Sequence, residues 1–170
     1  MRKIALFIVS LLSFSFPALA SPSDPEVVPS VDFQRYQGLW FEVAHSPNFF
    51  QRKCERSTAE YGLQKDGTIS VLNTCYKDDK AISTIRGSAW APNPKEPGKL
   101  VVDFGFFRKG DYWIVKLDTD YQWVVVSGPA KASIFILSRE APMASALQDR
   151  IIQTLREEGY HVDGLIYDKY

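Results

Sequence analysis

The feature that most constrains the fold is a series of short segments in which apolar and polar residues alternate, each followed by turn residues. An alternation with a period of two is typical of β-strands that have one buried face. Asp66-Gly67 is a strong hairpin signal, and a proline-rich break covers 92–98. We therefore expect eight strands, over 39–45, 57–63, 69–73, 82–91, 99–104, 112–117, 121–127 and 133–139.

The period changes after the eighth segment, where apolar residues recur about every four positions. This stripe is typical of an amphipathic helix and is formed by Met143, Leu147, Ile151, Ile152 and Leu155. Pro142 and Ser145 supply start signals, and Gly159 is a plausible stop. A short final strand is expected over 165–167.

Eight consecutive strands predict an all-β fold, an eight-stranded up-and-down antiparallel barrel with one C-terminal α-helix packed outside. An open sheet of this size would leave two strand edges exposed, and closure into a barrel removes them. An eight-stranded barrel has an interior just wide enough for one small ligand.

The first twenty residues have the pattern of a secretory signal peptide. Arg2 and Lys3 precede an apolar run over 4–12, and an A-x-A site ends at Ala20. We expect residues 1–20 to be the signal peptide, 21–30 a flexible leader rich in proline and serine, and 31–170 the folded domain. Cleavage after Ala20 would place the protein in the periplasm, and no cysteine near this site offers a point for lipid attachment.

Composition and motifs argue against several classes of function. The 20 basic and 20 acidic residues balance, so no global positive field favours a nucleic-acid partner. The two histidines, His45 and His161, lack the spacing of a metal site, and no phosphate-binding or nucleophile motif is present. We expect no metal, no cofactor and no catalytic residue, which favours a binding protein over an enzyme.

Cys54 and Cys75 are the two cysteines of the chain. In an exported protein an even pair predicts one disulfide bond. Two free buried thiols are the alternative, and a catalytic cysteine would need a base beside it.

Three short motifs carry a resemblance to a known family. They are Gly38-Leu39-Trp40 at the first strand, Thr119-Asp120-Tyr121 before the seventh, and Arg139 at the end of the eighth. In this order and at these distances they resemble the motifs of the lipocalin family. The stretches 36–44, 58–63 and 66–73 are similar to its branch of bacterial lipocalins and apolipoprotein D. The resemblance covers 31–170.

The resemblance implies a cup-shaped barrel, a calyx, that binds fatty acids, lysophospholipids or similar small lipophiles for storage or transport. The implied role is maintenance of the bacterial envelope under stress. It also implies a barrel floor built from Gly38, Trp40 and Arg139, with Arg139 across the Trp40 ring. Two departures are present: the chain lacks the lipidated cysteine of many bacterial members, and it has His45 where many have arginine.

The candidate ligand-binding residues are those that should face the barrel interior. Strand alternation selects Tyr61, Leu63, Val71, Asn73, Ile85, Ala89, Val102 and Phe104. The inward register of the family adds Tyr112, Ile114, Val126 and Phe135. Phe106 is expected at the open end, with Phe49, Phe50 and Phe107 in the same ring of loops.

Several alternatives stay open at this stage. The barrel could be packed solid and serve a structural role in the envelope, or it could be an enzyme that acts on a bound lipophile. A peripheral contact of the phenylalanine-rich loops with the outer membrane and a homodimer are also open.

Overall fold

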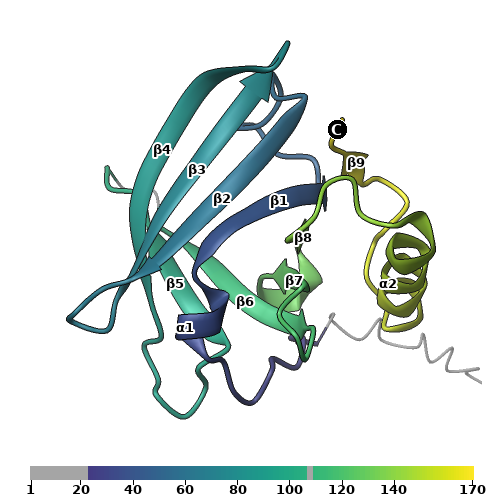
Figure 1. Ribbon diagram of the computed structural model, residues 1–170. Coiled ribbons are helices and arrows are strands. Elements are labelled where there is room, and N and C mark those ends of the chain that lie inside the picture. Colours follow the sequence, from purple (N-terminus) through teal and green to yellow (C-terminus); the bar gives the residue numbers. More distant parts are fainter. Residues whose placement is uncertain (1–22, 107–108) are drawn as a thin grey trace, which may run out of the picture.

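The computed structural model describes residues 23–106 and 109–170, and in this part of the chain one antiparallel sheet closes into a barrel (Figure 1). Each strand pairs with its successor, and β8 pairs with β1 to complete the ring. The predicted fold is therefore confirmed. The strands are β1 (Gly38–His45), β2 (Arg56–Leu63), β3 (Ile69–Lys77), β4 (Lys80–Trp90), β5 (Lys99–Asp103), β6 (Lys109–Leu117), β7 (Trp123–Ser127) and β8 (Ile134–Ser138).

Short helices and one further strand complete the fold: α1 (Phe33–Tyr36), the 3-10 turn η1 (Pro129–Lys131), α2 (Ser145–Glu157) and β9 (Ile166–Tyr167). The helix predicted from the apolar stripe is present, but Ala144 holds its N-cap position, so Ser145 is the first helical residue and caps nothing. Gly159 follows the helix with a φ of +81°, as its predicted stop role requires. Within the described residues, no helix is long and apolar enough to cross a bilayer.

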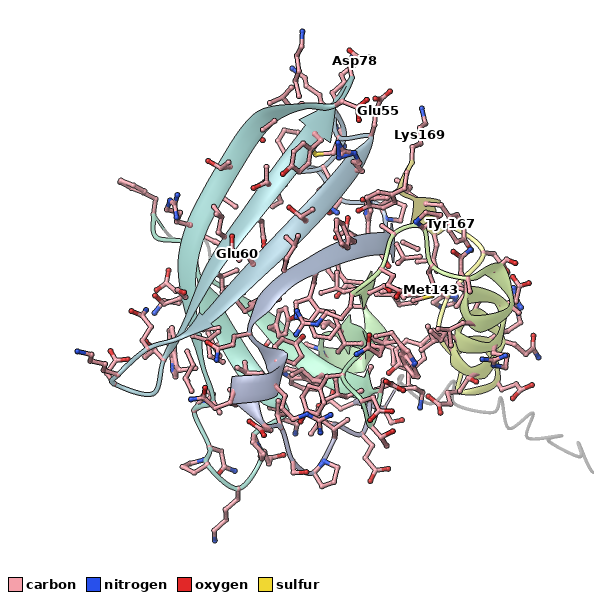
Figure 2. The ribbon with its side chains drawn as sticks, in the orientation of Figure 1. Glu55, Glu60, Asp78, Met143, Tyr167 and Lys169 are labelled. Atoms are coloured by element: carbon pink, nitrogen blue, oxygen red, sulfur yellow. A yellow bond between two sulfur atoms is a disulfide. The ribbon has the colours of Figure 1, made fainter. Side chains whose placement is uncertain are left out.

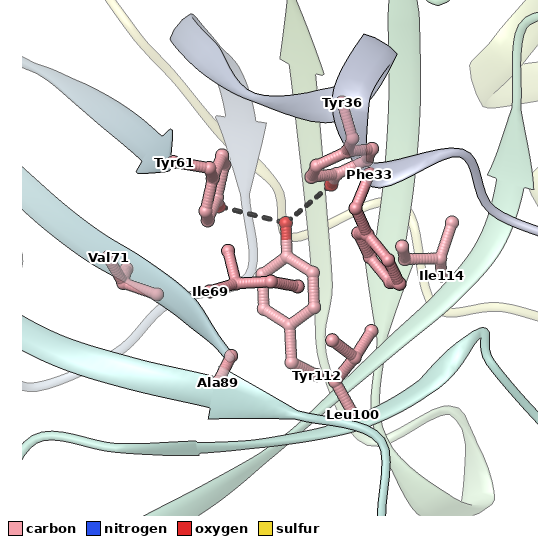
Figure 3. A pocket seen from close by; sticks show the side chains of 9 residues that line it. All are labelled: Phe33, Tyr36, Tyr61, Ile69, Val71, Ala89, Leu100, Tyr112 and Ile114. Carbon is pink, nitrogen blue, oxygen red and sulfur yellow. Dashed lines mark hydrogen bonds between the residues drawn. The ribbon is translucent and has the colours of Figure 1, made fainter. Parts of the chain in front are cut away.

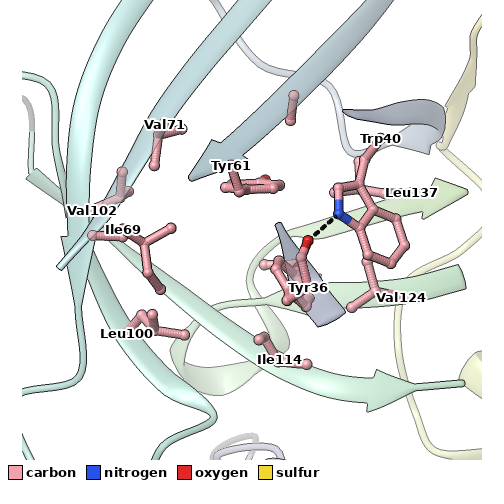
Figure 4. Close-up of a cluster of buried hydrophobic side chains, with 13 residues drawn as sticks. Tyr36, Trp40, Tyr61, Ile69, Val71, Leu100, Val102, Ile114, Val124 and Leu137 are labelled. Atoms are coloured by element: carbon pink, nitrogen blue, oxygen red, sulfur yellow. Dashed lines mark hydrogen bonds between the residues drawn. The ribbon is translucent and has the colours of Figure 1, made fainter. Parts of the chain in front are cut away.

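Two apolar clusters divide the molecule into an inside and an outside layer. The inner cluster fills the closed end of the barrel, and Figure 4 shows Trp40, Val124 and Leu137 on one side of it. The outer cluster joins the barrel wall to α2 through Val125 and Ile136 on the wall and Leu155 on the helix. The helix therefore packs outside the barrel, as predicted.

The N-terminal segment before α1 is attached to the barrel. Val28 N donates a hydrogen bond to Ile114 O (2.9 Å), and Asp24 Oδ1 accepts one from Ala130 N (2.9 Å). Pro25 is buried. The leader expected to be flexible therefore makes barrel contacts from Asp24 onwards, because it adds apolar side chains and main-chain hydrogen bonds to the wall. The predicted signal peptide, 1–20, lies outside the described residues.

The C-terminal residues fill a seam in the barrel wall. The pairing of β1 with β2 ends at Phe41, and beyond it β9 pairs with β1. Asp168 N then donates to Val43 O (3.1 Å) on β1, and Lys169 N donates to Glu55 O (2.9 Å) at the start of β2. Lys169 and Glu55 lie at the same end of the molecule in Figure 2, and their side chains form an ion pair (3.5 Å). This segment bridges two strands that no longer contact each other directly.

Candidate functional site

The closed end of the barrel is a floor formed by Trp40 and Arg139. Trp40 is completely buried, and its Nε1 donates to Tyr36 O (2.7 Å). The Arg139 guanidinium lies 3.8 Å from the centre of the Trp40 ring, so the predicted contact is present. Its nitrogens also donate to the carbonyl of Leu39 (2.7 Å) and to the carbonyls of residues 35–37 (2.9–3.1 Å). One side chain therefore ties α1, β1 and β8 together.

Gly38 occupies the place where the chain enters this floor. Its φ of +91° is a conformation that glycine adopts readily and other residues rarely do. A Cβ atom there would lie 3.5 Å from Arg139 Nη1. Glycine is therefore needed here mainly for the backbone conformation, and only to a lesser degree for the space beside the guanidinium.

A chain of three tyrosines crosses the lower half of the interior (Figure 3). We name Tyr36, Tyr112 and Tyr61 the tyrosine chain, because their hydroxyl groups are linked at 2.6 Å and 2.8 Å. Burial raises the pKa of all three phenols above the usual value. The cavity beside them has a volume of about 10 Å³, which is room for about one water molecule. The lower half of the barrel is therefore filled by protein.

The upper half of the barrel, toward the open end, is not filled in this way, because its inner wall is not covered by other protein groups. The first part of β4, residues 80–84, is exposed on both faces. Farther along the same strand Ile85 pairs with Asn73 of β3 and is only half-buried. Phe104 and Phe135 likewise face the inner cluster but remain partly accessible. Apolar surface on the inner wall is therefore available to a ligand near the open end.

The structure places most of the candidate ligand-binding residues on the inner face. Six are buried in the inner cluster, namely Tyr61, Val71, Ala89, Val102, Ile114 and Val126. Four pack against it while partly buried, namely Leu63, Phe104, Tyr112 and Phe135. Asn73 and Ile85 share that face by register. Their role in binding stays a prediction.

Phe106, the remaining candidate, does not lie on the inner face, and its role in binding stays a prediction. It is 90 % exposed and follows β5, which ends at Asp103, so strand alternation no longer sets its direction. Phe49 and Phe50 are also exposed, in the loop between β1 and β2. Phe107 lies outside the described residues. Phe49, Phe50 and Phe106 therefore lie at the rim of the barrel and not in its lining.

A disulfide bond joins Cys54 to Cys75 beside this rim, with a Cα–Cα distance of 5.3 Å. It links the loop that precedes β2 to the upper part of β3. The prediction of one disulfide is confirmed, and the readings as free thiols or as a catalytic cysteine are excluded.

Polar groups gather on the inner wall where β1 and β2 part. A β-bulge between Glu42 and Ala44 shifts the alternation of β1, so that Glu42 and His45 both face inwards, opposite Leu137 and Phe135 of β8. Asp168 enters from the C-terminal segment. Glu42, His45 and Asp168 each have one atom with a lone pair, a carboxylate oxygen or a ring nitrogen, and these three atoms lie within 4.8 Å of one another. We name the three residues the inner-wall cluster.

Hydrogen bonds hold two members of the cluster in place. Gln51 Nε2 donates to Glu42 Oε1 (2.5 Å) and to Ser57 Oγ (3.1 Å). Ser57 N donates to Asp168 Oδ2 (2.5 Å). The carboxylates are therefore anchored by an amide side chain and by the backbone of β2.

Burial shifts the acid–base properties of the cluster. Desolvation raises the pKa of Glu42 well above its usual value, and the nearby Asp168 carboxylate adds to the effect. Desolvation likewise raises the pKa of Asp168 to about 7 and lowers that of His45. All three shifts favour the uncharged form, which is the form that an apolar wall tolerates.

The fold and its floor define a class: a small cup-shaped β-barrel protein that is closed at one end and open at the other. The profile of the lipocalin-like domain family matches residues 31–169, and the chain therefore belongs to the lipocalin family. The predicted family membership is confirmed.

Individual relatives agree with this assignment. Temperature-induced lipocalin-1 of Arabidopsis thaliana is 36 % identical over 86 % of this chain and 83 % of its own length. The outer membrane lipoprotein Blc of Escherichia coli K12 is 30 % identical over 98 % of this chain and 97 % of its own. Insecticyanin from the tobacco hornworm Manduca sexta shares the fold, with a TM-score of 0.68, 20 % identity and coverage of 91 % and 88 % of the two chains.

Sequence reasoning missed several residues of the site. Tyr36 lies in the unexpected helix α1, and nothing in its immediate sequence indicates that it points into the barrel. Glu42 is an acidic residue in an otherwise apolar strand, which was the one available signal of a buried polar group. Asp168 lies far along the chain, and only the path of the C-terminal segment brings it to β1.

Proposed function

We propose that the protein binds one small lipophile, such as a fatty acid or a lysophospholipid, in the upper half of the barrel and carries it in the bacterial envelope. The observation that carries this proposal is the uncovered inner wall of β3 and β4 above the tyrosine chain. Ile85 on this wall is only half-buried, and an alkyl chain that packs there would gain about 0.8 kcal/mol for each methylene group that it buries.

The filled lower half sets where the ligand ends. A cavity of about 10 Å³ beside the tyrosine chain admits no alkyl chain, so the ligand rests above Tyr112. Asn73 lies at this level, and its buried Oδ1 finds no hydrogen-bond partner within the described residues. Such an atom favours a ligand that carries a hydroxyl or amide donor. The packed floor is thus compatible with a carrier, provided that the ligand occupies the mouth end.

The location in the envelope rests on three observations. The sequence begins with the pattern of a signal peptide, the cysteines form a disulfide, and the relative from E. coli is described as an outer membrane lipoprotein. Since no cysteine lies at the expected cleavage site, we propose a soluble periplasmic form whose exposed Phe49 and Phe50 contact the outer membrane peripherally. The role in membrane maintenance under stress belongs to the same proposal.

The test is displacement of a fluorescent fatty acid by unlabelled lipids, with a matched pair of variants on β4. Ile85→Asp places a charge on the inner wall, whereas Thr84→Asp places the same charge on the exposed outer face. We expect Ile85→Asp to weaken binding more than about 10-fold and Thr84→Asp to leave it unchanged. Failure of the wild-type protein to take up any lipophile would refute the proposal and support the packed, structural barrel.

A further inference from the structure

The inner-wall cluster brings three electron-pair donors to one point. The His45 side chain is 4 % exposed, and its Nδ1 lies 2.8 Å from Ser46 O. Asn48 Nδ2 also lies 3.2 Å from Nδ1, but it donates to Ser46 O (3.3 Å) as well. Because the nearer carbonyl oxygen can only accept, we assign the ring hydrogen to Nδ1, and Nε2 of the neutral ring then presents its lone pair. This Nε2 lies 3.8 Å from Glu42 Oε1, which is also an acceptor when ionised.

Gln51 and Ser57 donate to the two carboxylates, whereas residues 23–106 and 109–170 offer no donor to His45 Nε2, although the ring is nine-tenths buried. Glu42 is 6 % exposed, and an Asp168 oxygen lies within 4.8 Å of the ligand atoms of Glu42 and His45. A buried and a partly buried carboxylate that converge on an imidazole lone pair without a donor are an arrangement that a cation stabilises.

From this geometry we propose that Glu42, His45 and Asp168 bind one divalent transition-metal ion of the zinc class on the inner wall of the barrel. One imidazole nitrogen and two carboxylate oxygens suit Zn²⁺ better than Ca²⁺, which takes six to eight oxygen ligands. Three protein ligands leave one position of a tetrahedral site for water.

The distances fit such an ion after a small adjustment. Bond lengths of about 2.1 Å place the ligands of tetrahedral zinc about 3.4 Å apart. The distance of 3.8 Å between His45 and Glu42 is close to that value, and the largest separation, at most 4.8 Å, has to shorten by no more than about 1.4 Å. Asp168 supplies this movement most easily, because it is partly exposed and belongs to a terminal segment.

The surrounding hydrogen bonds are those of a supported metal site. A ligating histidine typically donates its other ring nitrogen to a carbonyl, as His45 does to Ser46 O. Asn48 accepts hydrogen bonds from Phe50 N (3.1 Å) and Gln51 N (3.0 Å), and its amide nitrogen donates to Gln51, which in turn donates to Glu42. The loop after β1 therefore fixes the orientation of both β1 ligands.

The expectation of no metal rested on sequence spacing, which does not register this cluster. Glu42 and His45 are three residues apart on a strand, where strict alternation would put them on opposite faces. The β-bulge returns them to one face, and the third ligand comes from the other end of the domain.

The test is isothermal titration of the purified protein, without a histidine tag and after treatment with a chelator, with ZnCl₂ and separately with CaCl₂. We expect one Zn²⁺ per chain and no comparable binding of Ca²⁺. His45→Ala should weaken zinc binding more than about 100-fold, whereas His161→Ala, at the other, exposed histidine, should leave it unchanged. Bound zinc should also raise the Tm of the wild type.

A second variant guards against a folding defect. Asp168→Asn keeps an acceptor for Ser57 N but removes the charge, and we expect at least about 10-fold weaker zinc binding with an unchanged near-UV circular dichroism spectrum. The proposal is overturned if the wild type binds no zinc, or if folded His45→Ala or Asp168→Asn protein binds it as the wild type does. Since zinc itself is measured, failure here is distinct from failure to bind a lipid.

Discussion

Replacing Arg139 by lysine should weaken the barrel floor while keeping the positive charge. The guanidinium donates to four main-chain carbonyls at 2.7–3.1 Å, those of Leu39 and of residues 35–37. A lysine ammonium is a point donor at the end of a flexible stem, and we expect it to retain one of these bonds. Three lost bonds at about 1 kcal/mol each give a destabilisation of about 3 kcal/mol.

The assay is equilibrium unfolding in urea at pH 7, followed by tryptophan fluorescence. Arg156→Lys is the matched control, because this arginine is half-exposed and pairs with Asp163 at 3.0 Å on the surface; it should change the free energy of unfolding by less than about 0.5 kcal/mol. Three of the bonded carbonyls belong to α1 and its cap, so trypsin should also cleave Arg139→Lys faster after Arg35. A lysine variant within about 1 kcal/mol of the wild type would refute the reasoning.

Three further outcomes follow from the same structure. Trp40→Ala should cost about 3–5 kcal/mol in urea unfolding, because the ring is completely buried; an unchanged Tm would contradict its place in the floor. Replacing Cys54 and Cys75 by serine opens a loop with a sequence separation of 21 and should cost about 3 kcal/mol, measured against the wild type under reducing and oxidising conditions. The tyrosine chain has raised pKa values in the folded state, so unfolded protein loses its phenolic protons first as the pH rises. Stability should therefore be complete below about pH 10 and fall above it, with tyrosinate absorbance rising only on unfolding; three phenols that ionise near pH 10 in folded protein would contradict their burial.

The sequence was sufficient for the barrel, because each strand carries its own alternation and each turn its own signal. The strands β2 and β3 illustrate this, since Asp66-Gly67 and the flanking apolar residues predict both their pairing and their inner face. The contact of Arg139 with Trp40 followed from the family resemblance and not from local pattern.

Some parts of the site could not be predicted, because they depend on structural features that the alternation of apolar and polar residues does not indicate. One extra residue in β1 turns His45 inwards, and no residue type near it announces a bulge. The filling of the lower half depends on Tyr36, which enters from the separate helix α1. Cavity size is likewise a property of packing between distant side chains, so the sequence could not separate a filled barrel from a hollow one.

The way in which the ring closes also bears on how the chain assembles. The hairpins from β2 to β4 join neighbours in the sequence, whereas the bond from Arg139 to Leu39 spans 100 residues. Contacts between distant residues carry the larger loop-closure entropy and form late. We therefore expect the folding chain to pass through a curved sheet that is open along one side. The closed end of the barrel, which is the most deeply buried part, should then form last.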